Sequence, residues 1–344
     1  MTTYKEIFGK AVKYLSTDPT DDIEGQIWYN STSGTFKTNV SLGGVWAAGG
    51  NMGSGRYIGG SAGIKTATWV AGGVNNPGGT ITNVTEEYNG TSWSPSGNMV
   101  TTRYGNTASA GTLTAGLSAG GRTGPTGIQV GNTEEYDGST WSEVNDLSNA
   151  RRYAAGFGTQ TAAVAAAGNG PGGNPSEITT TEEYDGTNWT AGGNMNQKRQ
   201  RGLGAGNSTL TAGLVIAGRI VDNGSNPIFG NTEEYDGTSW TVGGTLGTAR
   251  YSGGASGTQT SALFFGGATG DPGSSTAVAS TESYDGTSWT AGSDLSSARL
   301  MNFGTGASNT SALSAGSSQS DPAPATATEE FTDPTFETQT ITTS

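Results

Sequence analysis

The stretch Thr232-Glu233-Glu234-Tyr235-Asp236-Gly237-Thr238-Ser239-Trp240 decides the fold, because the chain repeats it. Its first four residues recur as Thr-Glu-Glu-Tyr from Thr85, Thr133 and Thr181, as Thr-Glu-Ser-Tyr from Thr281, and as Thr-Glu-Glu-Phe from Thr328. An aromatic residue follows five positions later in every copy, at Trp93, Trp141, Trp189, Trp240, Trp289 and Phe336. These tryptophans follow one another at 48 to 51 residues, and Trp46 lies 47 residues before Trp93. A period of this length is typical of propellers and solenoids.

Each unit is predicted to form four short strands. In the unit that begins at Arg250, the strands are 251–257, 261–267, one holding Glu282 and Tyr284, and one holding Trp289, with an Asp-Gly turn before the last. A sheet this small cannot bury both faces alone, whereas a closed ring of sheets covers them. We therefore predict an all-β propeller whose tyrosines and tryptophans pack between blades. Units at 55–99, 103–147, 151–195, 199–246, 250–295 and 299–336 predict six blades; a seventh, partial blade at 23–47 is the alternative.

A second regularity links arginine to glutamate. An arginine stands ten residues after Trp46 and after each of the five repeat tryptophans named above. These arginines are Arg56, Arg103, Arg151, Arg199, Arg250 and Arg299. The first glutamates of the repeats are Glu86, Glu134, Glu182, Glu233, Glu282 and Glu329. We predict structural ion pairs between the two sets, within a blade or across to the next, because a guanidinium holds a carboxylate with two parallel bonds. The alternative is a solvated surface pair of little energetic value. A residue present in every blade indicates scaffold, not catalysis.

The composition excludes several classes of function. The net charge is −13, with only 16 lysines and arginines, which argues against nucleic acid and anionic membranes as partners. There is no cysteine and no histidine, so disulfides, thiolate or imidazole metal sites and Ser-His-Asp triads are excluded. No apolar run is long enough to cross a membrane, and the N-terminus lacks a signal peptide pattern. We expect a non-enzymatic protein without metal or cofactor.

Residues 1–47 are predicted to form an attachment segment before a propeller at 48–344. Apolar residues at helical spacing predict a short helix over 4–15, with a strand over 11–15 as the alternative because Gly9 weakens the helix. A β-hairpin is expected over 26–38. Trp46 is expected to help close the ring beside the last blade, whose fourth strand holds Phe336.

Two resemblances extend this interpretation. The string Glu-Gly-Gln-Ile-Trp-Tyr-Asn-Ser-Thr-Ser-Gly-Thr-Phe-Lys at 24–37 resembles a short module of bacteriophage tail fibres and other virion proteins, many of them from marine phages. The blades resemble kelch repeats, with paired glycines such as Gly72-Gly73, Gly120-Gly121 and Gly266-Gly267 before the Tyr and Trp; Ala217-Gly218-Arg219 and Ala315-Gly316-Ser317 depart from that pattern. The resemblance implies a phage tail component, a fibre, tip or adaptor, assembled in the host cytoplasm. It would be present in several symmetric copies and bind other tail proteins through 1–47.

Differences between units gather in the loops between second and third strands, which share one face of a propeller with the blade-to-blade links. Such a face can bind a host surface glycan or receptor, although loops without constraint also vary. The candidate contact residues are Tyr57, Tyr104, Tyr153, Asp222, Asn223, Phe229 and Tyr251. A free lectin-like propeller that binds carbohydrate is the alternative function, and a glycan-cleaving enzyme is a third hypothesis.

Overall fold

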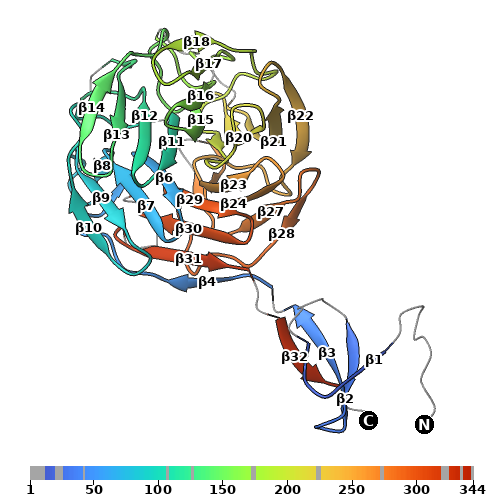
Figure 1. Ribbon diagram of the computed structural model, residues 1–344. Coiled ribbons are helices and arrows are strands. Elements are labelled where there is room, and N and C mark those ends of the chain that lie inside the picture. The colour runs from blue at the N-terminus through green and yellow to red at the C-terminus, as the bar shows by residue number, and fades with distance from the viewer. Residues whose placement is uncertain are drawn as a thin grey trace. The chain divides into compact units, whose positions relative to one another are not determined.

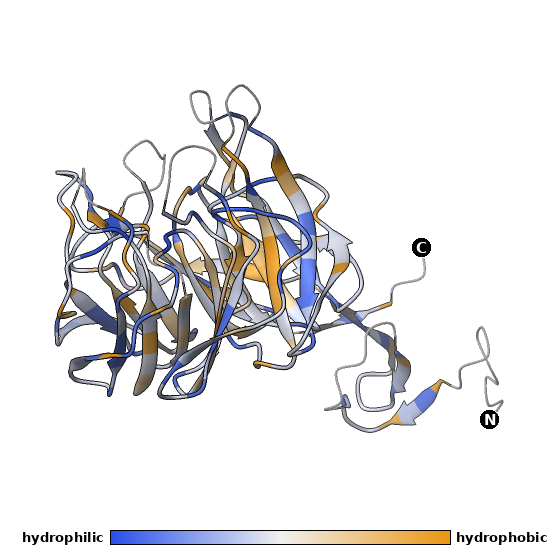
Figure 2. Cartoon of the chain, turned by 90° about the horizontal axis from the view of Figure 1, so that it is seen from above, coloured by the Kyte–Doolittle hydropathy of each residue, from blue (hydrophilic) through white to orange (hydrophobic). Residues whose placement is uncertain are grey.

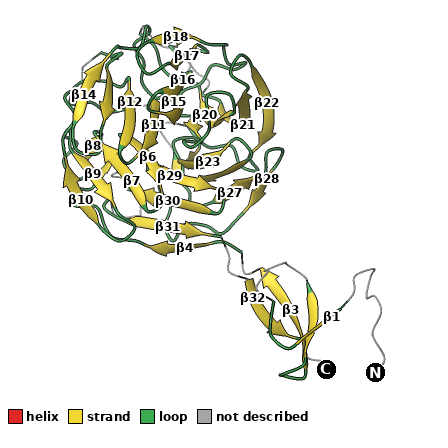
Figure 3. Cartoon of the chain, viewed as in Figure 1, coloured by secondary structure: helices red, strands yellow, loops and turns green. Residues whose placement is uncertain are grey.

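The computed structural model describes residues 12–19, 26–41, 43–105, 108–124, 128–171, 176–221, 226–271, 275–318, 325–333 and 336–341. These residues form strands and loops, and none of them is helical (Figure 3). The chain divides into a ring unit, Trp46–Thr332, and a small unit made of Met1–Val45 together with Asp333–Ser344. This division corrects the prediction of one continuous domain over 48–344, because the last residues belong with the first.

The ring unit repeats four-stranded antiparallel sheets in series, six of them within the described residues (Figure 1). From the inside outward, the strands of the successive sheets are β6 (Gly60–Ile64), β7 (Ala67–Ala71), β9 (Thr85–Tyr88) and β10 (Trp93–Ser96); β11 (Ala108–Thr112), β12 (Ala115–Ala119), β13 (Thr133–Tyr136) and β14 (Trp141–Val144); β15 (Ala155–Thr159), β16 (Ala162–Ala166), β17 (Thr181–Tyr184) and β18 (Trp189–Ala191); β19 (Leu203–Gly204), β20 (Gly213–Arg219), β21 (Ile228–Tyr235) and β22 (Trp240–Thr245); β23 (Gly254–Thr258), β24 (Ser261–Phe265), β27 (Thr281–Tyr284) and β28 (Trp289–Ala291); and β29 (Phe303–Ser308), β30 (Ser311–Ala315), β31 (Thr328–Thr332) and β4 (Val45–Ala48). Two short ladders join β5 (Arg56–Tyr57) to β8 (Val74–Asn75) and β25 (Ala268–Thr269) to β26 (Thr276–Ala277).

The sheets close into a circle. Their innermost strands contact one another in order, and β29 of the last sheet contacts β6 of the first (Figure 1). The outer edge of the last sheet is β4, which comes from the N-terminal side of the ring unit and lies beside β31. Trp46 therefore holds the fourth-strand position of that sheet. The prediction that Phe336 does so is wrong, because Phe336 lies in β32, a strand of the small unit, and β4 already covers that edge.

Apolar side chains fill the space between neighbouring sheets. The second strands are the most buried, as in β24, where every residue after Ser261 is buried. Figure 2 shows hydrophobic residues on strands inside the ring unit. Phe157 and Val164 of one sheet pack with Val215 and Tyr235 of the next, and similar clusters recur around the circle. Burial of such side chains stabilises the fold by roughly 1.5–3 kcal/mol each. The tryptophan of each fourth strand also donates its indole N–H to a threonine of the preceding sheet: Trp93 to Thr328, Trp141 to Thr85, Trp189 to Thr133, Trp240 to Thr181, Trp289 to Thr232 and Trp46 to Thr281.

Arginine and glutamate pair within each sheet's own unit. The six N–O distances are between 2.6 and 3.2 Å, in Arg56–Glu86, Arg103–Glu134, Arg151–Glu182, Arg199–Glu233, Arg250–Glu282 and Arg299–Glu329. Both partners are buried, and the second carboxylate oxygen accepts a backbone N–H, as Glu86 does from Gly53 at 2.6 Å. Burial lowers the pKa of Arg103 to about 10, so its guanidinium stays charged at neutral pH. Removing one partner would leave a buried charge uncompensated, which costs roughly 3–5 kcal/mol.

The second glutamate of the repeat joins neighbouring sheets. The hydroxyl of Tyr184 donates to Glu135 of the preceding sheet at 2.9 Å. The same bond links Tyr88 to Glu330, Tyr136 to Glu87, Tyr235 to Glu183 and Tyr284 to Glu234. The remaining junction has Ser283 and Phe331 at these two positions, so the carboxylate and the hydroxyl are lost together. The two substitutions are compatible with each other. A carboxylate that had lost its hydrogen-bond donor would destabilise the fold more than the absence of both the carboxylate and the hydroxyl.

The small unit holds one sheet in the order β1 (Lys13–Leu15), β2 (Ile27–Asn30), β3 (Thr35–Ser41) and β32 (Phe336–Thr340). Strand β1 runs parallel to β2, and the Tyr14 ring stacks on Tyr29 with 5.2 Å between centroids. The predicted helix over 4–15 is therefore wrong at its C-terminal end, and its part over 4–11 lies outside the described residues. Pairing with β2 and the aromatic contact outweigh the local helical pattern. The predicted hairpin is present as β2 and β3.

Asp18 links two strands of the small unit through hydrogen bonds. Its carboxylate accepts bonds from Lys37 at 2.7 Å, Asn30 at 2.7 Å and Trp28 Nε1 at 3.0 Å. These bonds, led by the one from Lys37, lower the pKa of Asp18 to about 2. The carboxylate therefore holds three donors from two strands of the sheet as long as it is ionised.

Replacing Tyr184 by phenylalanine should destabilise the ring by about 1–3 kcal/mol, because the Glu135 carboxylate loses its donor. The double variant Tyr184→Phe/Glu135→Ser copies the natural Phe331/Ser283 junction and should recover part of that loss. Chemical denaturation of the two single variants and the double variant measures the coupling. Strictly additive effects would contradict a bond between the sheets.

The lowered pKa of Asp18 predicts that the small unit loses stability as the pH falls. A carboxylate with a depressed folded-state pKa contributes its full stability above its unfolded pKa, about 4, and loses it as the pH falls toward 2. The Trp28 indole N–H resonance should therefore titrate with a midpoint near pH 2 in NMR spectra. In Asp18→Asn this titration should be absent, and a midpoint near pH 4 in the wild type would refute the assigned bonds.

Candidate functional site

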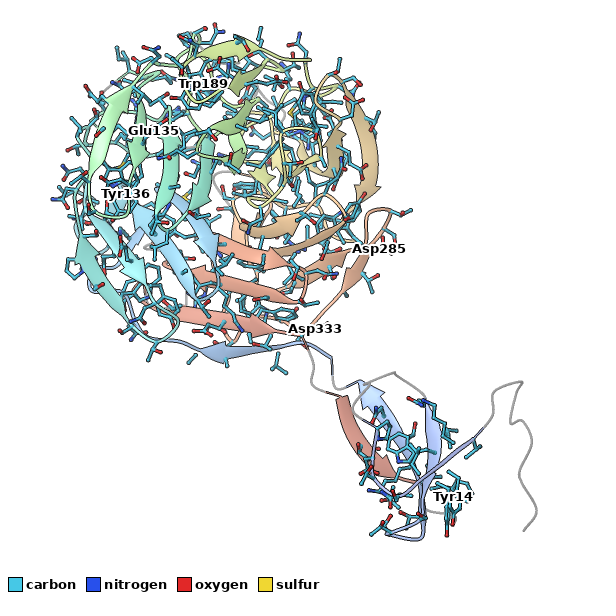
Figure 4. The ribbon with its side chains drawn as sticks, viewed as in Figure 1. Tyr14, Glu135, Tyr136, Trp189, Asp285 and Asp333 are labelled. Carbon is cyan, nitrogen blue, oxygen red and sulfur yellow. The ribbon has the colours of Figure 1, made fainter. Side chains whose placement is uncertain are left out.

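The turn face of the ring is uniform. Between third and fourth strands, an aspartate accepts backbone N–H groups two and three residues further on, at Asp137, Asp185, Asp236 and Asp285. Figure 4 labels Asp285 at the margin of the ring. The backbone bonds from Ser288 and Thr287 lower the pKa of Asp285. These aspartates serve the same turn in four of the sheets, and Asn89 does so in a fifth, so they belong to the scaffold.

The opposite face carries a closed circle of backbone hydrogen bonds, which we call the crown. Its members stand two residues after the paired arginines: Ile58, Gly105, Tyr153, Arg201, Ser252 and Met301. Each N–H donates to the carbonyl of the preceding member, at distances between 2.7 and 3.2 Å, and the Ile58 N–H closes the circle onto Met301. The crown lies directly before the innermost strands, at the same face as the loops between second and third strands.

The crown is strained where it carries side chains. All six members have φ between 54° and 63°, a conformation that suits glycine, yet only Gly105 is a glycine. Strain of this kind costs about 1–2 kcal/mol per residue and concentrates at functional sites. A chain with 59 glycines keeps five side chains there. At Gly105 a Cβ would lie 2.9 Å from the Tyr153 ring, so its absence makes room for that ring.

A cavity of about 110 Å³ occupies the centre of the ring beneath the crown, lined by residues of all six sheets' inner strands or their flanks. At the turn face the side chain of Asn207 bridges the channel, donating to the carbonyls of Gly63 at 3.3 Å and Gly306 at 2.5 Å. The volume equals that of a few water molecules, well below a drug-sized pocket. A ligand would therefore lie across the crown and insert only a substituent.

Tyr153 is the centre of an aromatic and cationic group on the crown. The guanidinium carbons of Arg201 and Arg152 lie 4.4 and 4.8 Å from the centroid of its ring. Burial, and then the neighbouring phenols of Tyr153 and Tyr104, raise the pKa of Tyr57. Three of the predicted contact residues, Tyr57, Tyr104 and Tyr153, are thus brought together around Arg201.

Arg219 extends this group outward. Its guanidinium lies 4.2 Å from the ring centroid of Tyr251, another predicted contact residue. Burial, followed by the like charge of Arg201, lowers the pKa of Arg219 to about 10. Its side chain is only 7% exposed, and its Nε and Nη1 have no hydrogen-bond partner in the structure. The nearby carboxylate of Glu177 is engaged by Gln200 at 2.6 Å and by the N–H of Val221 at 3.0 Å.

The other predicted contact residues are not part of this group. Phe229 lies 6.0 Å from the guanidinium of Arg199, one of the ion-paired arginines. Asp222 and Asn223 lie outside the described residues. Arg152, Arg201 and Arg219, which we call the arginine cluster, were not among the predicted contact residues. Arg152 and Arg201 interrupt the repeat, because the other units have uncharged residues at their positions, whereas Arg219 has a counterpart in Arg122.

The site offers both hydrogen-bond donors and an acceptor. The donors belong to the arginine cluster, and Asn302, which lines the cavity and is 6% exposed, has a buried Oδ1 without a partner. Within the described part of the chain no three acidic, histidine or cysteine residues are grouped to hold a metal ion. No described helix could span a membrane.

Replacing Ser252 by glycine should leave the ring as stable as the wild type or raise its stability by up to about 1 kcal/mol, because glycine adopts this φ without strain. The matched control is Ser256→Gly in β23, where glycine should cost about 0.5–1 kcal/mol. Thermal unfolding of the two variants measures the difference. Equal losses would show that the crown is not strained.

The chain was compared with known proteins once this geometry was established. A scan against protein-family models finds no match, and a search of curated proteins finds none either. The argument for function therefore depends on the residues of the ring and the small unit themselves.

Proposed function

We propose that the chain is a non-enzymatic virion protein of a bacteriophage tail, a fibre, tip or adaptor that attaches to the host surface. In this proposal the ring unit is a six-bladed, kelch-like β-propeller whose crown face binds a host surface glycan or receptor. The small unit binds other tail proteins, and several copies assemble symmetrically in the host cytoplasm before joining the virion.

The observation that carries the proposal is the separation of repeated from unrepeated chemistry. The repeated polar side chains are engaged in the scaffold: glutamates with arginines or tyrosines, aspartates with turns, threonines with indoles. By contrast, Arg152, Arg201 and Tyr153 stand at repeat positions that hold other residue types in the other units, and they gather around one end of the central cavity. A rigid ring with one chemically distinct face suits recognition, and the prior engagement of its carboxylates favours binding over glycan cleavage.

The proposal for the small unit has separate support. Its sheet includes the hairpin whose sequence resembles a module of virion proteins. Tyr14 is 69% exposed, stacks on Tyr29, and Tyr29 meets Phe36 edge to face at 5.2 Å (Figure 4 labels Tyr14). Exposed aromatic side chains of this kind are enriched at protein interfaces, which fits attachment to another tail protein.

A free lectin-like propeller remains the second candidate, because the arginine cluster and its tyrosines need no particle in order to bind. The two functions differ in where the chain is found. A virion protein is a stoichiometric component of purified particles, whereas a free lectin binds host glycan but is absent from them.

Purified chain should compete with phage particles for host cells and slow their adsorption. The variant Tyr153→Ala should compete at least about tenfold less well, since it removes the ring between two arginines. The control Lys65→Ala changes a side chain of a turn that contacts Thr332 and should compete like the wild type. Mass spectrometry of purified particles supplies the second measurement. Absence of the chain from particles would refute the virion role, and no competition by the wild type would refute host attachment.

A further inference from the structure

We propose that the arginine cluster binds the carboxylate of an acidic saccharide, with the sugar lying across the crown. This inference names the ligand class for the proposed host recognition and rests on that function. The charges of the chain are the first observation that supports the proposal. The chain carries a net charge of −13, yet Arg152, Arg201 and Arg219 form no ion pair and no side-chain hydrogen bond within the described residues.

Arg219 is the strongest indication of an anion. A buried guanidinium ordinarily has its donors paired, because an unsatisfied charged group is costly to bury. Arg219 is more than nine-tenths buried against Tyr251, and it has two unpartnered nitrogens and a second cation, Arg201, beside it. A bound carboxylate would pair with the guanidinium in its planar fork and remove the repulsion between the two arginines.

Glu177 does not supply that anion. It influences the ionisation of Arg219, but no ion pair forms between them. One of its carboxylate oxygens is held by Gln200 and Val221, and the other, Oε2, is buried without a hydrogen-bond partner. The paired arginines of the scaffold show the contrast: Arg199 has a glutamate oxygen at 2.6 Å and two carbonyl acceptors, and only its Nε has no partner. Arg219 differs from it because Arg219 has no ion pair and two nitrogens without a partner.

The rest of the site favours a sugar acid over a bare anion. Asn302 lines the cavity, and its buried Oδ1 is an acceptor without a partner, a group that suits a hydroxyl donor and not an anion. Tyr57, Tyr104 and Tyr153 add ring faces and hydroxyls at the crown. A uronic or sialic acid combines one carboxylate, several hydroxyl donors and apolar C–H faces. The cavity of about 110 Å³ would take one substituent of such a sugar.

The test uses the full chain and calorimetric titration with two probes, trigalacturonate and sialyllactose. Their neutral counterparts are the methyl ester of trigalacturonate, and lactose. We expect at least one acidic probe to bind, its neutral counterpart to bind at least about tenfold more weakly, and added salt to weaken the acidic probe. Arg201→Gln and Arg219→Gln should each weaken it at least about tenfold. Both variants should fold, because neither arginine leaves a partner unpaired.

The matched control is Lys65→Gln, which removes the same charge from a turn that contacts Thr332. It should leave the affinity for the acidic probe unchanged. Binding of neither acidic probe, equal binding of the neutral counterparts, or unchanged affinity in both arginine variants would overturn the inference. Equal or tighter binding of a triglutamate peptide would also overturn it in favour of an acidic peptide ligand.

The test of the carboxylate site and the test of the tail function can fail independently of each other. If the chain slows phage adsorption but binds no acidic probe, the carboxylate site is refuted and host recognition stands. If acidic probes bind through the cluster but the chain neither competes with particles nor occurs in them, the site stands and the tail function is refuted.

Discussion

The structure depends on the contact that each sheet makes with the next. A four-stranded sheet of this length has two faces to cover, and only its neighbours can cover them. Indole-to-threonine bonds and tyrosine-to-glutamate bonds fix the spacing of these contacts, since each acceptor belongs to the preceding sheet. The last sheet meets the first through Trp93 and Tyr88, and it is completed by β4 from the other end of the ring unit. The ring is therefore stable only when closed.

Buried charge makes the same ring rigid. Each arginine–glutamate pair holds a blade-to-blade link against the third strand of its own sheet. Backbone groups also bond to both partners, as in Arg151–Glu182, although the Nε atoms of Arg56, Arg103, Arg199 and Arg250 have no partner. The crown begins two residues beyond each of these arginines, so the ion pairs position the strained residues that surround the cavity. In this way the scaffold fixes the place of side chains such as Arg201 and Tyr153, whose identities differ from sheet to sheet.

The candidate site was only partly predictable. Tyr57, Tyr104, Tyr153 and Tyr251 could be selected because their place after the paired arginines puts them on the face with the variable loops. Arg219 could not, since its importance comes from burial against Tyr251 and the lack of a partner, which are properties of the folded chain. The correspondence between Ser283 and Phe331 could not be predicted from the sequence either. The two residues are 48 positions apart, and only the register of neighbouring sheets shows that they occupy one junction.

The sequence by itself determined the all-β class, the four-stranded unit and the two sets of arginines and glutamates that pair, because a strict period repeats the same local geometry along the chain. The structure decided that each pair forms within one unit. Only the tertiary structure decided which sheet contains the segments near Leu15 and Phe336. A local pattern predicts a helix near Leu15 and a blade strand at Phe336, but β1 pairs with β2 and β32 with β3 in the small unit. Strand pairing joins residues distant in sequence, and its energy exceeds the weak local preferences of short segments.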